Sequence, residues 1–179
     1  MSKLRNEENI IRRAKEGDVT AFEEIIEAFQ DVVYTKSYYI MGNQEDALDV
    51  MQSVFLKVFL SIRRFKGQSM LSTWIYRITV NTCLRELKKR KRIPPAEVDI
   101  ELTPIDKTIQ SEEEIIAEKV LNQLPDPYRV ILVMREMSDM SFKDIAKELK
   151  IKENLAKVRA FRAKNRFKQL MKEYLKDGE

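Results

Sequence analysis

One stretch, from Leu71 to Arg92, most constrains what this chain folds into. Its sequence, LSTWIYRITVNTCLRELKKRKR, predicts a helix with two unlike faces, because apolar and polar residues each recur every three or four positions. The apolar face holds Leu71, Trp74, Ile75, Ile78, Leu84 and Leu87, and the other face holds Arg77, Asn81, Arg85, Lys88 and Arg92. Ser69 or Ser72 is the expected cap at its start, and the proline pair that follows ends it.

The polar face has the chemistry of a nucleic-acid surface. Six of the eight residues from Arg85 to Arg92 are basic, although a solvated helix end is the plain alternative for a basic run alone. Asn81 both donates and accepts hydrogen bonds, which suits a base edge, and Arg77 suits phosphate or the plane of a base. Trp74 and Tyr76 add flat surface nearby. Polynucleotide binding is therefore the leading hypothesis.

The loop before this helix, residues 63–73, is indicated by Gly67 and Ser69. Phe65, Lys66 and Gly67 make it both basic and aromatic, a composition that suits an unstacked base. Phe65 is equally expected as a plug in the core. The sequence leaves both roles of Phe65 open.

Composition points to an all-α protein in which any enzymatic chemistry would rest on carboxylates or Lys. The chain has only 4 Gly, 5 Pro and almost no alternating apolar runs, so helices should dominate. It has no His, the commonest general base, and we expect no catalytic residue, metal or cofactor. The lone Cys83 is expected in the core. A charged N-terminus and the lack of a long apolar run predict a cytoplasmic protein.

Charge divides the chain into three parts. Residues 1–92 carry a net charge of +5, residues 93–118 carry −7, and residues 119–179 carry +6. Residues 93–113 combine acids and three prolines without a helical stripe, which indicates an extended linker. We therefore expect two small helical domains, 1–92 and 114–179, joined by the acidic linker 93–113.

Three helices are expected before the loop, over residues 7–16, 21–41 and 46–62. Gly17 and Gly42 end the first two, and Asp18 or Thr20 caps the second. The third helix turns Asp46, Asp49 and Gln52 outward on a face that is short of bulky groups. By spacing alone this is an ordinary solvated face.

The C-terminal part predicts a helix-turn-helix. After helices at 114–124 and 128–137, Ser141 caps a short helix, a tight connection follows at 150–152, and a longer helix begins at Glu153. The second helix of such a pair enters the major groove of DNA. Its basic residues include Lys157, Arg159, Arg162, Lys164 and Arg166.

Two blocks of the sequence resemble one family. NQEDALDVMQSVFLKVF with FKGQSMLSTWIYRITVNTCLRELKKRKR resembles the promoter-melting domain (sigma region 2) of extracytoplasmic function (ECF) sigma factors of bacterial RNA polymerase. LPDPYRVILVMREMSDMSFKDIAKELKIKENLAKVRAFRAKNRF resembles their C-terminal helix-turn-helix domain (sigma region 4). The resemblance spans roughly residues 8–175 and includes the linker in the family's order.

The resemblance implies roles for these surfaces. Asp46, Asp49 and Gln52 would dock on the clamp helices of the polymerase's largest subunit, which replaces the solvated-face interpretation. The loop from Phe65 to Leu71 would hold a flipped base of the minus-ten element. The residues implied at the melted non-template strand are Phe65, Lys66, Gly67, Trp74, Arg77, Asn81, Arg85 and Lys88. Those implied at the duplex minus-thirty-five element are Lys157, Arg159, Arg162, Lys164 and Arg166.

The same resemblance implies partners. They are core RNA polymerase, promoter DNA, and a membrane-bound anti-sigma factor that no residue of this chain identifies. The protein would act as a monomer on the polymerase, and the linker would run toward the active-site cleft.

The sequence departs from the family's pattern at several positions. Leu48 and Ser53 stand where the family usually has Glu, and Lys150 stands where the turn usually has Gly. A non-Gly residue in a left-handed conformation there would cost on the order of 1 kcal/mol. The family's Gly-Thr-Val at the start of the recognition helix is replaced by Asn154, Leu155 and Ala156, so minus-thirty-five specificity is the least certain of the implied roles.

Two other functions fit parts of the pattern. A transcriptional regulator would bind duplex DNA through the helix-turn-helix without polymerase. A Mg²⁺-dependent nuclease would use acids such as Glu23, Glu24 and Glu27, or Glu45, Asp46 and Asp49. The nuclease is the weaker hypothesis, because such acids are far commoner on solvated helix faces.

Overall fold

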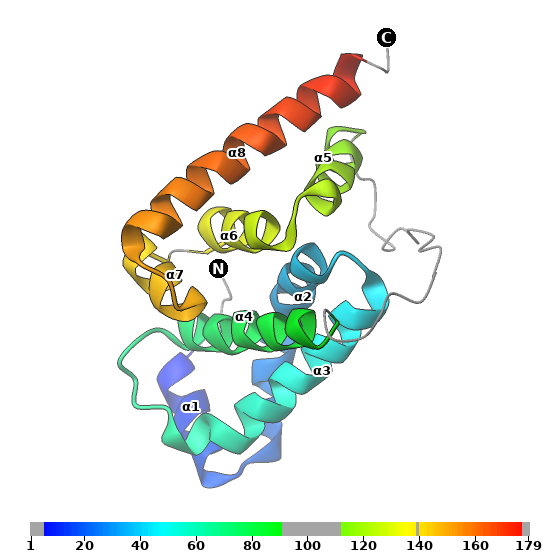
Figure 1. Ribbon diagram of the computed structural model, residues 1–179. Coiled ribbons are helices and arrows are strands. Elements are labelled where there is room, and N and C mark those ends of the chain that lie inside the picture. The colour runs from blue at the N-terminus through cyan, green and yellow to red at the C-terminus, as the bar shows by residue number, and fades with distance from the viewer. Residues whose placement is uncertain (1–5, 91–111, 139, 177–179) are drawn as a thin grey trace.

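The computed structural model describes residues 6–90, 112–138 and 140–176. All secondary structure in these ranges is helical, which confirms the predicted all-α class. The elements are α1 (Glu7–Glu16), α2 (Val19–Met41), α3 (Gln44–Ser61), the 3-10 turn η1 (Ile62–Arg64), α4 (Leu71–Arg90), α5 (Glu112–Gln123), α6 (Asp126–Glu136), α7 (Phe142–Leu149) and α8 (Glu153–Lys176). Figure 1 shows them as two groups, α1–α4 and α5–α8.

The predicted linker falls almost wholly outside the described residues. Of residues 93–113, only 112 and 113 are described, and they begin α5. The helix therefore starts two residues before the predicted boundary at 114.

Capping residues fix where the first helices begin. The Asp18 carboxylate accepts hydrogen bonds from the backbone N–H groups of Thr20 (2.9 Å) and Ala21 (3.2 Å), so Asp18 is the cap of α2. Asn43 caps α3 by accepting from Asp46 N at 2.9 Å. This cap explains why α3 starts at residue 44 and not at 46 as predicted.

The start of α4 is held by another helix. The backbone N–H of Leu71 donates to Glu7 Oε1 on α1 at 3.3 Å. The sequence predicted Ser69 or Ser72 for this role, and a carboxylate 64 positions away fills it. A negative group also suits the positive end of the α4 dipole. The contact joins the N-terminal segment to the loop that precedes α4.

The core of the first group lies where α2, α3 and α4 meet. Ile25, Val54 and Ile75, one from each helix, are at most 1% exposed. Burying a side chain of this size contributes about 1.5–3 kcal/mol. The same packing fixes which face of α4 remains outside.

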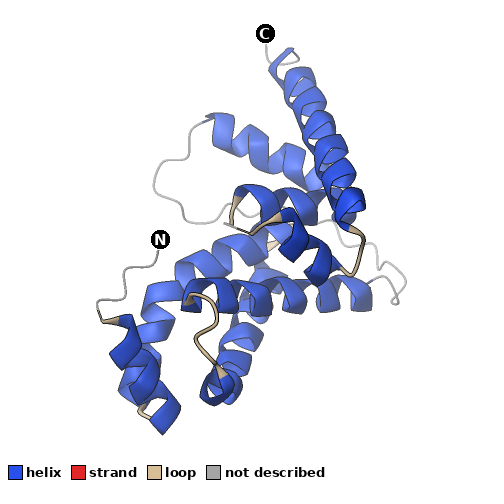
Figure 2. Cartoon of the chain, turned by 90° about the vertical axis from the view of Figure 1, so that its left-hand side faces the viewer, coloured by secondary structure: helices blue, strands red, loops and turns tan. Residues whose placement is uncertain are grey.

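In the second group α6 is the buried centre. Ile131 and Met134 on α6 are fully buried, and α8 presents Ala156 and Ala163 to this core. Small residues allow α8 to approach closely, while α7 packs against its N-terminal part (Figures 1 and 2). The α7–turn–α8 pair has the predicted helix-turn-helix layout, and Ser141 caps α7 by accepting from Asp144 N at 3.1 Å.

The two groups of helices touch through a buried arginine. Arg129 of α6 is 7% exposed and donates from Nε to the carbonyl of Ile40 at the C-terminal end of α2 (2.9 Å). Its Nη2 lies 2.8 Å from Asp126 Oδ1, while burial lowers the pKa of the guanidinium. Gly42 makes this approach possible, because a Cβ there would lie 3.0 Å from Asn122 Oδ1.

One turn residue adopts the left-handed conformation that the family resemblance implies at this position. Lys150 ends α7 with φ 54° and ψ 45°, and the next N–H, of Ile151, bonds back to Ala146 O at 3.0 Å. The left-handed conformation costs a non-Gly residue about 1–2 kcal/mol. Glycine avoids this cost, at an entropic penalty of roughly 0.5–1 kcal/mol.

Lys150→Gly should therefore raise the free energy of unfolding by about 0.5–1 kcal/mol, measured by urea denaturation followed by circular dichroism. The matched control is Lys152→Gly, an exposed position in the same connection whose φ is not positive. That control should be neutral or slightly destabilising. A loss of stability in the Lys150 variant would contradict the strain.

Candidate nucleic-acid interface

Helix α4 separates its faces much as predicted, but the buried face is broader. Leu71, Ile75 and Leu87 are buried as expected, whereas Trp74, Ile78 and Leu84 are only half-buried. The helix also buries Tyr76, Thr79, Val80, Thr82 and Cys83. Tyr76 was predicted to offer flat surface for a base, and that prediction is wrong because its ring faces the second group of helices.

Two buried groups on α4 show how tightly it is covered. The Lys36 ammonium lies 4.1 Å from the centre of the Tyr76 ring. Cys83 is fully buried, and burial raises the pKa of its thiol to about 12. The thiol therefore stays protonated and uncharged in the core.

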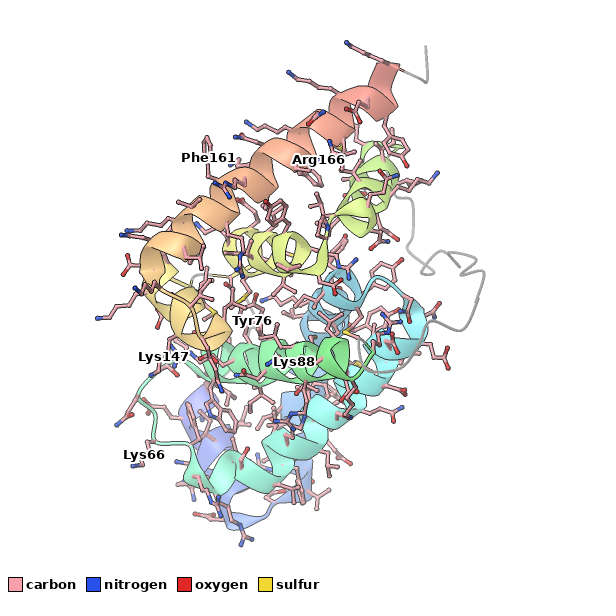
Figure 3. All side chains as sticks on the ribbon, in the orientation of Figure 1. Lys66, Tyr76, Lys88, Lys147, Phe161 and Arg166 are labelled. Carbon is pink, nitrogen blue, oxygen red and sulfur yellow. The ribbon has the colours of Figure 1, made fainter. Side chains whose placement is uncertain are left out.

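The outer face of α4 carries the predicted polar residues. Asn81, Arg85 and Lys88 are exposed and Arg77 is half-buried (Figure 3 labels Lys88). They continue along the helix at intervals of three and four, so they form one stripe. The predicted Arg92 lies outside the described residues. This stripe can accept a polyanion along about three turns of helix.

Two members of the stripe have partners on α7. Arg77 Nη2 lies 3.0 Å from Asp144 Oδ1, and its Nε lies 3.7 Å from Glu148 Oε1. Asn81 Nδ2 donates to Glu148 Oε2 at 2.7 Å. The pKa of Asp144 is lowered by a hydrogen bond from the Ser141 hydroxyl and by the charge of Arg77. These contacts were not anticipated, because the residues are 67 positions apart.

The loop before α4 separates an aromatic plug from an exposed tip. Phe65 is 6% exposed and packs on Trp74 with ring centres 5.1 Å apart, so it occupies the core and its ring is not presented to solvent. Lys66 and Gly67 are exposed, and Lys66 points away from the helices in Figure 3. Gly67 has φ 67° and open space around its α-carbon. The tip, and not the Phe65 ring, is available to a ligand.

The outer face of α3 is polar at one end and apolar at the other. Asp49 and Gln52 are exposed, while Asp46 is ion-paired with Arg90 and accepts from Asn43 Nδ2 at 2.8 Å. Exposed apolar side chains on the same helix are Leu48, Leu56, Phe59 and Leu60. The prediction of a face short of bulky groups is therefore wrong. The available signal was that α3 has more apolar residues than one buried stripe requires.

A contiguous patch of exposed apolar side chains marks an interaction surface, whereas singly exposed apolar residues are ordinary. Leu56 and Leu60 are 60% and 68% exposed, one turn apart, and Leu56 is one turn beyond Gln52. The polar and apolar parts of α3 therefore adjoin.

Helix α8 presents a second basic surface. Lys157, Arg162, Lys164 and Arg166 are exposed and Arg159 is half-buried. Lys157 pairs with Glu153 at 2.8 Å and Lys164 lies 3.9 Å from Glu136, pairs too exposed to hold these cations against a phosphate. Leu155, Val158 and Phe161 are exposed among them, which sequence reasoning missed. Figure 3 shows Phe161 pointing away from α6.

The described ranges hold neither a metal-binding cluster nor a membrane-spanning helix. No three His, Cys, Asp or Glu side chains there gather in a group that would hold a metal ion, including the acids named for a nuclease. No helix there is long and apolar enough to span a membrane.

Two sigma-factor profiles match the chain. Sigma-70 region 2 matches residues 25–93, and Sigma-70, region 4 matches residues 115–167. The first contains α3 and α4, and the second contains the helix-turn-helix.

Curated relatives align over nearly the whole chain. The ECF RNA polymerase sigma factor SigW of Bacillus subtilis (strain 168) is 27% identical over 91% of this chain and 95% of its own length. SigM of Mycobacterium tuberculosis (strain H37Rv), also an ECF RNA polymerase sigma factor, is 30% identical over 90% of this chain and 82% of its own. The ECF RNA polymerase sigma-E factor of Escherichia coli (strain K12) is 29% identical over 92% and 93%.

Solved structures share the fold. The sigma factor RpoE from Bartonella quintana, in complex with the anti-sigma factor NepR, has a TM-score of 0.67 at 22% identity over 84% of this chain and 96% of its own. CnrH, in complex with the cytosolic domain of CnrY, has a TM-score of 0.64 at 18% identity over 93% and 97%.

Phe65→Ala should cost about 3–5 kcal/mol of unfolding free energy, because it empties a buried aromatic site. Trp74, the one tryptophan of the chain, touches the ring and reports the change by fluorescence during urea denaturation. Phe161→Ala is the matched control, since that ring is 67% exposed, and it should shift stability by less than about 0.5 kcal/mol. Equal effects of the two changes would show that Phe65 is not a core residue.

Proposed function

The chain belongs to the extracytoplasmic function sigma factors, and on that basis we propose which of its surfaces perform each step of initiation. As an alternative sigma factor it binds core RNA polymerase and directs promoter recognition, DNA melting and transcription initiation. It guides the polymerase's chemistry and catalyses no reaction itself. The proposal assigns residues 1–92 to polymerase and the minus-ten element, and residues 114–179 to the minus-thirty-five element.

The outer face of α3 docks on the clamp helices of the largest polymerase subunit. Asp49 and Gln52 are free for polar contacts, and Leu56 and Leu60 supply apolar area beside them. A polar rim around buried apolar anchors is the usual anatomy of a protein interface. Asp46 joins this contact when polymerase replaces Arg90 as its partner.

The α4 stripe and the loop tip hold the melted non-template strand. Arg77, Asn81, Arg85 and Lys88 follow the strand, and the tip at Lys66 and Gly67 receives a flipped base. Unstacking a base costs a few kcal/mol, and contact with an aromatic or Arg side chain returns roughly 1–3 kcal/mol per base. The surface therefore binds bases that have already opened, and this binding needs no energy from another reaction.

Phe65 and Trp74 support this site from beneath. Their packing fixes where the loop leaves the core, so the tip is placed relative to Asn81. Phe65 was predicted to contact DNA. Its burial favours a role in positioning the loop, with the half-buried Trp74 nearer the surface.

Helix α8 reads the duplex minus-thirty-five element. Lys157, Arg159 and Arg162 lie on its N-terminal half, which a helix-turn-helix places in the major groove. Lys164 and Arg166 lie further along and suit phosphates. Leu155 and Val158, exposed beside them, suit the methyl group of thymine.

An anti-sigma factor and a cytoplasmic location complete the proposal. RpoE was solved with the anti-sigma factor NepR and CnrH with the cytosolic domain of CnrY, which supports a similar partner for this chain. Polymerase works in the cytoplasm, and a sigma factor bound to it as a monomer acts there.

One observation carries the assignment: the outer faces of α3 and α4 are separate surfaces on one packed group of helices. We assign the α3 face to polymerase and the α4 face to DNA. Run-off transcription with purified core polymerase tests it. Asn81→Ala should make promoter opening less favourable by about 0.5–1.5 kcal/mol, the net value of one hydrogen bond, while polymerase binding stays unchanged. Permanganate reactivity of unpaired thymines measures the opening.

Gln52→Ala is the reciprocal variant. It should weaken binding to core polymerase, measured by fluorescence polarisation, and leave the opening of the residual complex normal. If both changes weakened only duplex binding without polymerase, the chain would act as an independent helix-turn-helix regulator and the assignment would be wrong.

A further inference from the structure

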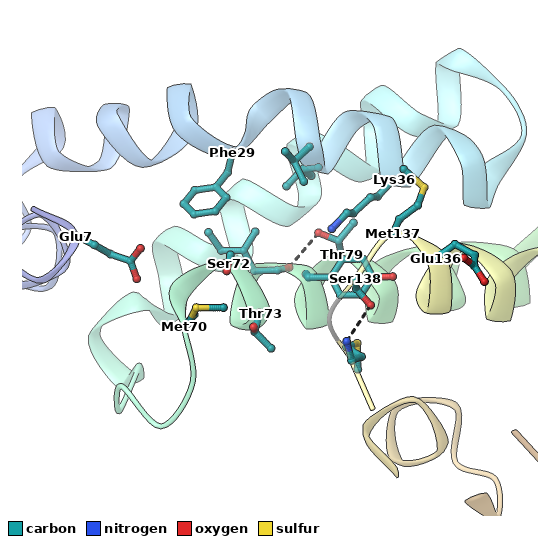
Figure 4. A pocket seen from close by; sticks show the side chains of 15 residues that line it. Glu7, Phe29, Lys36, Met70, Ser72, Thr73, Thr79, Glu136, Met137 and Ser138 are labelled. Carbon is teal, nitrogen blue, oxygen red and sulfur yellow. Dashed lines mark hydrogen bonds between the residues drawn. The ribbon is translucent and has the colours of Figure 1, made fainter. Parts of the chain in front are cut away.

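The loop proposed to receive a flipped base is held at both ends by helix α1. At the end of the loop, the backbone N–H of Leu71 donates to Glu7 Oε1 at 3.3 Å. At its start, the Lys15 ammonium lies 5.8 Å from the centre of the buried Phe65 ring. Figure 4 shows Glu7 reaching from α1 toward the segment that carries Met70. One helix, to which no individual role has been assigned, therefore contacts both ends of the loop.

The two contacts lie on one side of α1. Glu7 and Lys15 are eight residues apart, and a spacing of seven or eight residues returns to the same face of a helix. Along the helix axis this spacing is about 12 Å. Arg63, just ahead of the loop, passes the C-terminal end of α1, because a Cβ at Gly17 would lie 3.5 Å from Arg63 Nη2. Helix α1 therefore lies across the base of the loop and sets how far apart its ends are.

Helix α1 is itself fixed in place. Ile10 and Ala14 are 4% and 6% exposed and belong to the hydrophobic core. On another side of the helix, Arg13 lies 2.7 Å from Asp18 Oδ2 and 3.0 Å from Glu24 Oε1, at the start of α2. Apolar burial and ion pairing together hold α1 against α2, so the core determines where the Glu7 carboxylate sits.

The tip of the loop has little packing of its own. Lys66, Gly67 and Gln68 are exposed, and nothing lies within 4 Å of the place that a Cβ on Gly67 would occupy. A segment with few packing contacts opens easily unless its ends are held. A binding site is selective when its geometry is fixed before the ligand arrives. The choice among bases at this tip therefore depends on how firmly the two ends are held.

Glu7 is the stronger of the two anchors. Its carboxylate faces the positive end of the α4 dipole, and a charged acceptor makes a stronger hydrogen bond than a neutral one. Leu71 is 0% exposed, so water cannot replace the carboxylate on its N–H unless the loop moves. Loss of the Glu7 carboxylate therefore either leaves a buried N–H without an acceptor or shifts the start of α4.

We propose that Glu7 is a positioning residue for base selection: by holding the start of α4 from α1, it fixes the shape of the tip at Lys66 and Gly67 and limits which base the tip accepts. This inference rests on the proposed function. It deepens that function by adding a residue that acts on DNA only through the loop. Removal of the carboxylate should relax the choice of base more than it weakens transcription as a whole.

The first test measures the loop in the free chain, without polymerase. Hydrogen exchange followed by mass spectrometry reports how often the amides of residues 66–72 open. Glu7→Ala should speed their exchange about two- to fivefold, the range that corresponds to losing an anion at a helix N-terminus. The matched control is Glu8→Ala, which removes an exposed acid one position along the same helix and should leave these amides unchanged.

The second test measures base selection by run-off transcription with core polymerase. Four templates differ only in the base at the minus-ten position where the wild type discriminates most strongly. Glu7→Ala should reduce the ratio between the best and the worst template about two- to fivefold, the fold-change expected in the first test. Glu7→Gln keeps an acceptor oxygen and should retain most of the ratio, and Glu8→Ala should retain all of it. A merely structural loss would lower transcription from all four templates by one factor.

Equal exchange in the Glu7→Ala and Glu8→Ala proteins, or an unchanged template ratio in the Glu7→Ala protein, would overturn this role of Glu7. If Glu7→Ala fails to fold, Glu7→Gln takes its place in both tests, with a smaller change expected in the same direction. Failure of the wild type to transcribe with core polymerase would overturn the proposed function instead. Hydrogen exchange would still decide whether Glu7 positions the loop.

Discussion

The structure depends on the burial of one side of α4. Leu71, Ile75, Val80 and Leu87 are at most 6% exposed, and burying each contributes about 1.5–3 kcal/mol. Displaying basic residues close together on the opposite side costs only tenths of a kcal/mol per pair in water. Burial therefore decides how the helix is rotated, and the basic stripe is the consequence. The same core orients α3, so the proposed polymerase face and the proposed DNA face cannot turn relative to each other.

Under the proposed assignment, this rigidity lets the binding of one partner favour the binding of the other. In that assignment, polymerase bound to α3 places the α4 stripe beside DNA that opens transiently, and the capture of bases then holds the DNA open. Thermodynamic linkage makes such coupling reciprocal, so polymerase would raise the affinity for DNA and DNA the affinity for polymerase.

Much of the fold was predictable from local signals. Helical periodicity located the helices, and Gly17, Asp18, Ser141 and the strained Lys150 act at the ends where they were expected. Long-range contacts were not predictable in this way. The cap of α4 by Glu7 and the pairing of Asp144 with Arg77 join residues more than 60 positions apart, which periodicity does not record.

The candidate site was predicted in its outline and missed in its detail. Asn81, Arg85 and Lys88 lie on one exposed face, as spacing required, but Tyr76 is buried because the second domain covers it. Phe65 had two open interpretations, and burial decides for the core. The exposure of Leu56 and Leu60 was not predicted, because a sequence shows which residues are apolar but not which of them stay exposed on the folded chain. The roles of these residues toward polymerase and DNA remain predictions.

The central claim is that α4 touches the separated strand while α3 sits on polymerase. Site-specific photo-cross-linking in the initiating complex tests it most directly, with a photoactivatable group at position 81 and, separately, at position 52. The account predicts that position 81 cross-links to the non-template strand of the minus-ten element and position 52 to the largest polymerase subunit. Cross-links from position 81 to polymerase alone, or from position 52 to DNA, would contradict it.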